Sequence, residues 1–193
     1  TVTMPRGGAT QTRTFNYELS TGRLLSATNP ENGTVSYTWN ADGTLLRKTD
    51  AKGQKVEYSY DGHRRVTQVR RYKASGTEEA CQRADLYYDS NPLQSSYSQN
   101  AWGRLTAAQW GGTSCTGGRW SEMYSYTAAG RATKKRLVRG ESPYLEGIWT
   151  WDNEGRMVSV TYPNGGLKYT YTYDSMGRPV KLTDNQATPK EWV

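Results

Sequence analysis

Aromatic and small polar residues alternate along this 193-residue chain in a short pattern that recurs seven times. The full pattern reads aromatic, polar, aromatic, then a few polar residues, a glycine, an arginine and an apolar residue, and most copies follow it closely. Aromatic residues two apart lie on the same face of a β-strand, and strands favour aromatic side chains. Each copy therefore predicts one strand, a tight turn and a second strand.

The aromatic residues stand six and four positions before the glycine, and we name them the first ring and the second ring of a copy. In the first copy the pair is displaced by one residue, and in the fourth copy only the first ring is present. The predicted strand residues are Phe15, Tyr17, Tyr37, Trp39, Tyr58, Tyr60, Tyr97, Tyr124, Tyr126, Trp149, Trp151, Tyr171 and Tyr173.

An Asn or Asp stands three positions before the glycine slot in five copies, at Asn40, Asp61, Asn100, Asp152 and Asp174. Such a side chain accepts hydrogen bonds from the backbone of a turn, and glycine adopts the positive φ that closes a turn with a bulge. Glycine and arginine each occupy six of their seven slots, which include Gly22, Arg23, Gly43, Arg65, Gly103, Arg104, Gly130, Arg131, Gly155, Arg156, Gly177 and Arg178. Arg64 fills the third glycine slot, so we expect Gly62 to take the positive φ in that turn.

The segments that follow the turns complete the prediction of fold. Residues 24–28, 66–69 and 157–161 are short aliphatic or β-branched runs, and no window shows the period of an amphipathic helix. We expect an all-β fold, an antiparallel β-hairpin meander with roughly 12 to 15 strands and almost no helix. Because strand twist keeps a sheet of this size from staying flat, the sheet should curve strongly or spiral into a partial shell.

Two insertions interrupt the regular spacing, near residues 73–96 and 111–118. Each insertion holds one cysteine, Cys81 in the first and Cys115 in the second. Each also follows the second strand of its copy, so both should project from the same rim of the sheet. A disulfide between the two cysteines and two inert thiols are both compatible with this placement.

The copies at residues 58–61, 149–157 and 171–179 resemble the YD repeat of the Rhs family, and the resemblance extends from Phe15 to about Trp192. It implies a β-hairpin ribbon that spirals into a hollow shell, as in toxin-complex cocoon proteins, Rhs polymorphic toxins and teneurins. In those proteins the shell encloses a toxic C-terminal domain or serves adhesion. The self-cleaving core segment of the cargo-carrying members has no counterpart after Thr183.

The resemblance therefore implies a scaffold. We expect residues 1–193 to form a single YD-repeat array of about seven units, from a longer bacterial protein that is secreted or displayed at the cell surface. The expected partners are neighbouring YD repeats of the parent chain or an enclosed effector domain. Exposed sheet edges make self-association a further expectation.

Composition narrows the remaining functions. The mean hydropathy is −0.90, and no apolar run approaches the roughly 18 residues of a membrane span, so membrane insertion is not expected. The 15 Tyr and 7 Trp, against one Phe, distinguish the chain from disordered sequences.

The net charge of +7 suggests a nucleic acid or another polyanion as a binding partner. The basic runs at 70–73 and 134–136 are short, however, and a strand would divide them between two faces, so nucleic-acid binding is not expected.

Catalytic chemistry has little support in the sequence. The one histidine, His63, lies in a turn, and the glycine-rich segment 112–118 lacks the Lys-Ser/Thr ending of a phosphate loop. The turn carboxylates are spread along the repeats instead of converging. We predict no catalytic residue, no metal and no cofactor. Carbohydrate or cell-surface binding through exposed Trp and Tyr remains an alternative function, and polyanion binding a less favoured one.

The repeated rings suggest how the copies hold together. We expect them to stack on one another across adjacent strands. The arginine after each turn should lie on those rings or pair with the turn carboxylate of the next copy.

Overall fold

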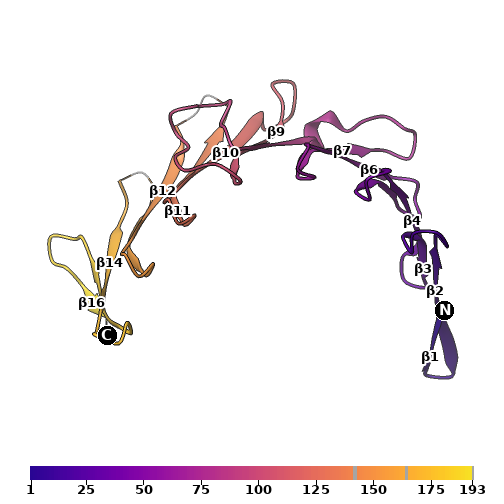
Figure 1. Cartoon of the computed structure of the whole chain (residues 1–193), viewed down its shortest axis with the longest axis horizontal. Coiled ribbons are helices and arrows are strands. Elements are labelled where there is room, and N and C mark those ends of the chain that lie inside the picture. Colours follow the sequence, from indigo (N-terminus) through magenta and orange to yellow (C-terminus); the bar gives the residue numbers. More distant parts are fainter. Residues whose placement is uncertain (141–142, 164, 193) are drawn as a thin grey trace. The chain divides into compact units, whose positions relative to one another are not determined.

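A computed structural model describes residues 1–140, 143–163 and 165–192 of the chain (Figure 1). Sixteen strands lie in these ranges, and the order of the strands in the sheet follows their order in the sequence. All the strand pairs described are antiparallel, and the only helix in this part of the chain is one 3₁₀ turn. The predicted all-β meander is confirmed, with one strand more than the upper expectation. None of the described ranges contains a helix long and apolar enough to span a membrane.

The chain divides into two compact units, Thr1–Asp85 and Leu86–Val193. The first unit begins with a long hairpin and continues as a meander of short strands. Its elements are β1 (Val2–Arg6), β2 (Ala9–Tyr17), β3 (Leu24–Asn29), β4 (Gly33–Trp39), β5 (Leu45–Thr49), β6 (Lys55–Tyr60), β7 (Val66–Tyr72), the 3₁₀ helix η1 (Ala80–Gln82) and the first residues of β8 (Ala84–Tyr88).

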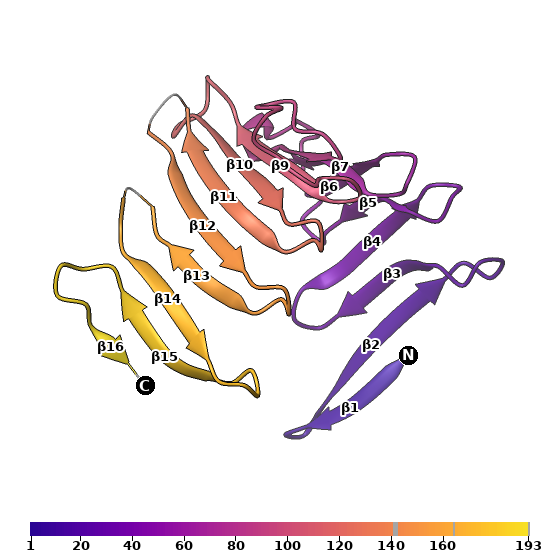
Figure 2. The same ribbon diagram turned by 60° about the vertical axis from the view of Figure 1, so that its left-hand side comes forward.

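The second unit is a meander of the same kind, in which β9 to β15 follow one another side by side (Figure 2). Its strands after β8 are β9 (Leu105–Gly111), β10 (Arg119–Tyr126), β11 (Ala132–Arg139), β12 (Leu145–Trp151), β13 (Met157–Thr161), β14 (Lys168–Tyr173), β15 (Pro179–Asp184) and β16 (Glu191–Trp192).

The register of the hairpins shifts at one recurrent place. The shift falls immediately before the second ring in six hairpins, between Asn16/Tyr17, Thr38/Trp39, Ser59/Tyr60, Ser125/Tyr126, Thr150/Trp151 and Thr172/Tyr173. This irregularity is the bulge that the Asx and glycine spacing predicts. Because a bulge increases local twist, its recurrence adds twist at the same place in each of these six hairpins.

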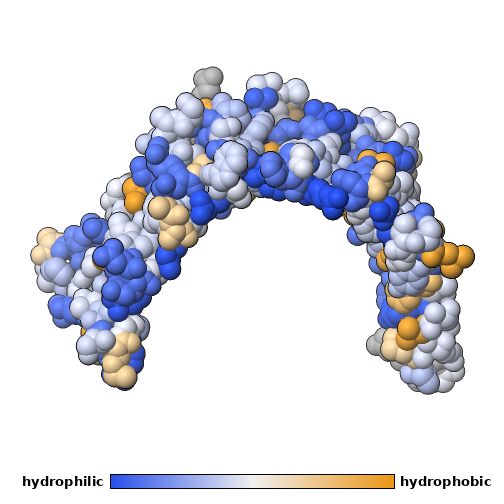
Figure 3. All heavy atoms as spheres, viewed as in Figure 1, coloured by the Kyte–Doolittle hydropathy of each residue, from blue (hydrophilic) through white to orange (hydrophobic). Residues whose placement is uncertain are grey.

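The two faces of the sheet differ in chemistry. In the hairpin of β4 and β5, Trp39 faces Leu45 on one side while Thr38 faces Arg47 on the other. On that polar side Arg47 Nε donates to Glu57 Oε1 over 2.7 Å. The view in Figure 3 shows mostly hydrophilic and intermediate residues with scattered hydrophobic ones. A single layer of strands buries few side chains, so cohesion must come mainly from contacts between adjacent strands.

One segment covers part of the polar face of the second unit. The segment between β8 and β9 folds back so that Tyr97, which is 7% exposed, packs with Ala107 and Met123. The prediction that Tyr97 is a repeated strand residue is therefore wrong. The predicted insertion at 73–96 is likewise divided in two, because β8 lies within it.

Candidate functional site: contacts between neighbouring repeats

The turn after each second ring uses the same two backbone hydrogen bonds. In the sixth copy the Asp152 amide donates to the Arg156 carbonyl and the Gly155 amide donates to the Asp152 carbonyl, both over 3.0 Å. The same pair of bonds forms in the turns that begin at Asn40, Asp61, Thr127 and Asp174. Gly155 has a φ of +82°, a conformation in which a Cβ is strained. The predicted hairpin turn is thus present in five copies in the same form.

The turn carboxylate binds the arginine of its own copy. Asp174 Oδ1 accepts the backbone N–H of Arg178 over 2.9 Å and Oδ2 accepts its Nε over 2.7 Å. The backbone N–H of Arg178, followed by its side chain, lowers the pKa of Asp174. Asp61 is held in the same way by Arg65, first through the backbone N–H, and its pKa is also lowered. The expectation that arginine pairs with the carboxylate of the next copy is wrong in these turns.

Asp152 follows the same geometry with a different electrostatic balance. Its carboxylate accepts the backbone N–H of Arg156 over 2.8 Å and the Arg156 Nε over 2.6 Å. Desolvation opposes ionisation of this carboxyl, but the bonds from Arg156 outweigh it and lower the pKa of Asp152. The three aspartates are therefore caps of their turns.

The third copy closes its turn without glycine. Arg64 itself has a φ of +61°, and its amide donates to the Asp61 carbonyl over 3.0 Å. Gly62 does not take a positive φ, so that prediction is wrong. The Asp61 side chain accepts backbone hydrogen bonds and so holds this turn in place. The turn requires a left-handed backbone conformation at its fourth residue, whichever residue stands there.

The first and fourth copies differ from the others in turn length. In the first, the Glu18 amide donates to the Arg23 carbonyl, so the turn holds one residue more and the displacement of Phe15 and Tyr17 is explained. In the fourth, the Asp89 amide donates to the Arg104 carbonyl over 3.1 Å. The Gly103 amide donates to Asp89 Oδ1 over 2.6 Å.

Asp89 thus has the role that the sequence analysis assigned to Asn100. Tyr88 is then the second ring of this copy, and the residues between Asp89 and Gly103 are an insertion within the turn. Asn100 instead donates from Nδ2 to the Tyr126 carbonyl over 2.9 Å. The run Leu86-Tyr87-Tyr88-Asp89 carries the signal that would have identified this strand correctly.

The second ring of a copy is tied to the preceding copy by its polar atom. Trp151 Nε1 donates to the Ala132 carbonyl and the Tyr173 hydroxyl donates to the Met157 carbonyl, both over 2.8 Å. Trp39, Tyr60 and Tyr126 donate in the same way to Leu24, Leu45 and Leu105. The acceptor is always the apolar residue after the arginine slot. These bonds form a ladder that runs from hairpin to hairpin.

The rings do not stack on one another as expected. Within the described ranges the ring pairs in contact are Tyr162–Tyr169 and Tyr169–Trp192, and neither joins two of the predicted repeat rings. A ring whose polar atom is directed at a backbone carbonyl of the preceding hairpin lies between strands, where another ring cannot lie parallel to it. The first rings share the same face without a hydrogen bond of this kind; Tyr171, for example, faces Leu182.

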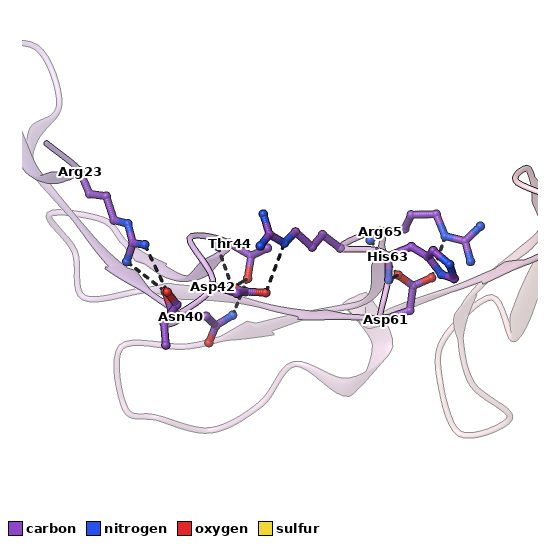
Figure 4. Close-up of polar contacts among 9 residues, drawn as sticks. Arg23, Asn40, Asp42, Thr44, Asp61, His63 and Arg65 are labelled. Carbon is purple, nitrogen blue, oxygen red and sulfur yellow. Dashed lines mark hydrogen bonds and ion pairs between the residues drawn. The ribbon is translucent and has the colours of Figure 1, made fainter. Parts of the chain in front are cut away.

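The arginine of a copy covers the second ring of the following copy. The guanidinium carbons of Arg104, Arg131 and Arg156 lie 5.8, 5.9 and 4.9 Å from the ring centres of Tyr126, Trp151 and Tyr173. In the first unit, Arg23 Nη1 donates to the Asn40 carbonyl over 3.1 Å (Figure 4). The expectation that arginine lies on the rings is correct for these three pairs, and the ring always belongs to the next copy.

The glycine slot makes room for that arginine. A Cβ at Gly155 would lie 1.8 Å from Arg131 Nη2, and one at Gly130 would lie 2.7 Å from Arg104 Nη2. Gly22 has a φ of +71° but nothing within 4 Å of a Cβ position. Glycine is therefore required for two reasons in the fifth and sixth copies, the positive φ and the close guanidinium, and for the positive φ alone in the first copy.

Two departures from the repeat pattern occur as a pair. Thr44 fills the arginine slot of the second copy, and Arg64 fills the glycine slot of the third. Arg64 Nε lies 4.0 Å from Asp42 Oδ2, so here the later copy extends an arginine toward the earlier one (Figure 4). Because Thr44 is too short to cover the third turn, that space is open to a side chain at position 64.

The remaining candidate residues are the histidine His63, the possible metal ligands and the two cysteines. The His63 amide donates to Asp61 Oδ1 over 2.9 Å, which places His63 inside the capped turn (Figure 4). The described residues contain no group of three or more His, Cys, Asp or Glu side chains arranged to hold a metal ion. Cys81 lies in η1 and Cys115 in the loop between β9 and β10, and neither is a free thiol. Their pairing with each other stays a prediction.

Comparison with known proteins gives a consistent picture. A family model described as RHS Repeat matches residues 39–78 and 151–189. The crystal structure of TcdB2-TccC3-TEV is similar over 96% of this chain and 11% of that one, with 13% identity and a TM-score of 0.64. That of TcdB2-TccC3 without its hypervariable C-terminal region is similar over 95% of this chain and 11% of that one, with 12% identity and a TM-score of 0.67. The comparison with curated proteins gave no match. The structural matches show a shared fold in which this chain spans a small part of a much longer one.

Proposed function

Since this chain belongs to the RHS-repeat family, we propose that it is a non-enzymatic wall segment of an RHS shell that encloses an effector or toxin domain. One observation carries the proposal. The residues that recur in the sequence are engaged with the neighbouring copy, the second ring with the copy before and the arginine with the copy after. Repeated residues with this use build a wall by nearest-neighbour contacts.

The ionisable groups of the repeats support an architectural role. The carboxylates with lowered pKa values, Asp61, Asp152 and Asp174, each accept hydrogen bonds from the backbone and arginine of one turn. A carboxylate saturated in this way is a poor general base. The turns that hold these groups are also spaced along the sheet instead of converging on one cleft.

We expect the parent protein to supply the partners of the wall. TcdB2-TccC3 has a hypervariable C-terminal region by its printed name, and the chain spans 11% of that protein. We propose that the parent of this chain likewise carries further RHS repeats and an enclosed C-terminal domain, and that it is secreted or displayed at the cell surface. The pairing of Cys81 with Cys115 belongs to this proposal, because a disulfide persists in oxidising surroundings.

Protease protection in the parent protein tests the wall function. An enclosed domain should resist a soluble protease in the unaltered parent and become cleavable when Trp151→Ala removes one bond of the ladder. Tyr171→Phe, which alters a first ring on the same face, is the matched control and should leave protection intact. Equal resistance of all three proteins, with Trp151→Ala shown to weaken the fold, would overturn the proposal. The mass of the unreduced chain tests the disulfide, which removes two hydrogens.

A further inference from the structure

A row of four side chains crosses the polar face of the second unit, where β11 to β14 lie side by side (Figure 2). Lys134 of β11 pairs with Ile148 of β12, which pairs in turn with Thr161 of β13. Thr161 pairs with Lys168 of β14. Residues directly opposite each other on neighbouring strands carry their side chains on the same face. The row therefore has a lysine at each end, and we name these four residues the lysine row.

The two lysines of the row carry positive charge without a partner. Both are exposed, and neither Lys134 nor Lys168 forms an ion pair or a side-chain hydrogen bond within the described ranges. The carboxylate of Glu146, on the same face, is already bound by Arg136 Nε over 2.8 Å, and both of these side chains are 15% exposed. The field of this face is therefore complementary to negative charge.

A groove of about 450 Å³ lies at the centre of the lysine row. It is lined by Ile148 and Thr161 of the row, and by Pro143, Tyr144 and Tyr162 among others. The rings at its rim are accessible, since Tyr144 is 48% exposed and Tyr162 is 54% exposed. An apolar groove with accessible rings is typical of a surface that binds another molecule. The groove can receive an apolar side chain between the two charges.

The same face already holds an aromatic side chain from outside the strands. Tyr97, in the segment between β8 and β9, packs with Ala107 and Met123. The guanidinium carbon of Arg136 lies 4.6 Å from the ring centre of Tyr97 and 3.7 Å from that of Tyr144. The surface on which this segment packs thus continues, through Arg136 and Tyr144, into the open groove. An aromatic side chain is therefore the occupant that best fits the groove.

We propose that the lysine row binds an extended acidic segment of a partner protein, with an aromatic side chain in the groove and a carboxylate on each lysine. Neighbouring strands lie about 4.8 Å apart, so Lys134 and Lys168, on strands three intervals apart, are separated by about 14 Å. An extended chain rises about 3.4 Å per residue and carries every second side chain on one face. Two carboxylates four residues apart therefore reach both lysines, with the middle side chain over the groove.

The partner pattern is acidic, any, aromatic, any, acidic. A polyanion of uniform charge lacks the apolar group that the groove requires, and for this reason the surface favours a protein segment. The interaction goes beyond the wall function, because the lysine row lies on the face opposite the rings and takes no part in the ladder or in the arginine contacts.

Fluorescence anisotropy of a labelled peptide, Gly-Ser-Glu-Ser-Phe-Ser-Glu-Ser-Gly, titrated with the whole chain tests the proposal. The peptide should bind saturably. Lys134→Gln and Lys168→Gln should each weaken binding about two- to fivefold, the effect expected when one exposed ion pair is lost. Lys52→Gln is the matched control, because Lys52 is an exposed lysine in a turn of the first unit. Circular dichroism establishes that each variant is folded.

Two altered peptides separate the aromatic side chain and the spacing from charge alone. Replacing the phenylalanine by serine should weaken binding about tenfold, because the groove then stays in contact with water. Moving both glutamates next to the phenylalanine keeps the composition but places the acidic and aromatic side chains on opposite faces of the extended peptide. This second peptide should bind more weakly by a similar factor.

The proposal is overturned if the first peptide does not bind, if both lysine variants bind it as the unaltered chain does, or if either altered peptide binds equally well. Single-stranded DNA supplies negative charge without the acidic protein pattern. If it binds more tightly than the peptide and depends on Lys134 and Lys168, the face recognises phosphate and the proposal is likewise overturned.

Discussion

The contacts between copies take one form in the second unit, whereas the first unit has a different form between its second and third copies. In the second unit an arginine at one turn covers a glycine at the next, as Arg131 covers Gly155. Between the second and third copies of the first unit, Thr44 replaces the arginine and Arg64 replaces the glycine, and the guanidinium approaches Asp42 from the opposite direction. The difference shows that the two slots, about twenty residues apart in sequence, act as one structural position.

Gly155→Ala should have the largest effect, because it breaks the arrangement found in the second unit. The new Cβ strains a φ of +82° and displaces Arg131 from Trp151, which together should lower the free energy of unfolding by about 2–3 kcal/mol. Gly22→Ala is the control, since it pays only the backbone strain of about 1–2 kcal/mol. Urea unfolding measures both. Measured in the Arg131→Ala background, Gly155→Ala should cost only as much as Gly22→Ala does, and an undiminished loss there would contradict the role of the guanidinium.

Restoring the usual arginine at position 44 and the usual glycine at position 64 tests whether the two slots are coupled. Arg64→Gly relieves the positive φ of a non-glycine residue and should stabilise the first unit by about 1 kcal/mol. Thr44→Arg alone should destabilise, because two guanidinium groups then compete for one space. In the double variant the arrangement of the second unit is restored, and the stability should exceed the sum of the single effects by about 0.5–1 kcal/mol. Thermal unfolding of the four proteins gives the coupling, and strict additivity would show that the two slots are independent.

Removing one hydroxyl tests the ladder with little change in packing. Tyr173→Phe deletes the donor to the Met157 carbonyl and should lower the free energy of unfolding by about 1 kcal/mol. Tyr171→Phe, on the same strand and face, should change it by much less. Urea unfolding of the two variants compares them directly. Equal losses would mean that the second ring contributes by burial alone.

The turn carboxylates should make stability depend on pH in acid. Because their pKa values are lowered in the fold, the stability they contribute is complete above the ordinary carboxyl pKa of about 3.9 and is lost as the pH falls through the lower folded values. Asp152→Asn should flatten this dependence while keeping the turn, since Asn40 serves in the same position. Melting temperatures between about pH 7 and about pH 2 measure it. If Asp152→Asn leaves the pH dependence unchanged, the loss of stability in acid must come from other ionisable groups.

The sequence predicts the fold well because its signals are local. Ring pairs, Asx caps and glycines determine each hairpin within about ten residues, and the meander follows from their repetition. The family resemblance is likewise confirmed. The fourth copy was misassigned because an insertion separates Asp89 from Gly103, and spacing alone then favours Asn100. The ring that an arginine covers could not be read from spacing, since it lies in a different copy and depends on how neighbouring strands pack.

The ladder has a direction, and that direction matches the order in which a ribosome releases the chain. The donor ring always stands later in the sequence than the carbonyl that receives it, as Tyr173 does relative to Met157. Each emerging hairpin thus meets an acceptor that is already in place. The sheet can then fold from its N-terminal side, one hairpin at a time, before the later parts of the chain are made.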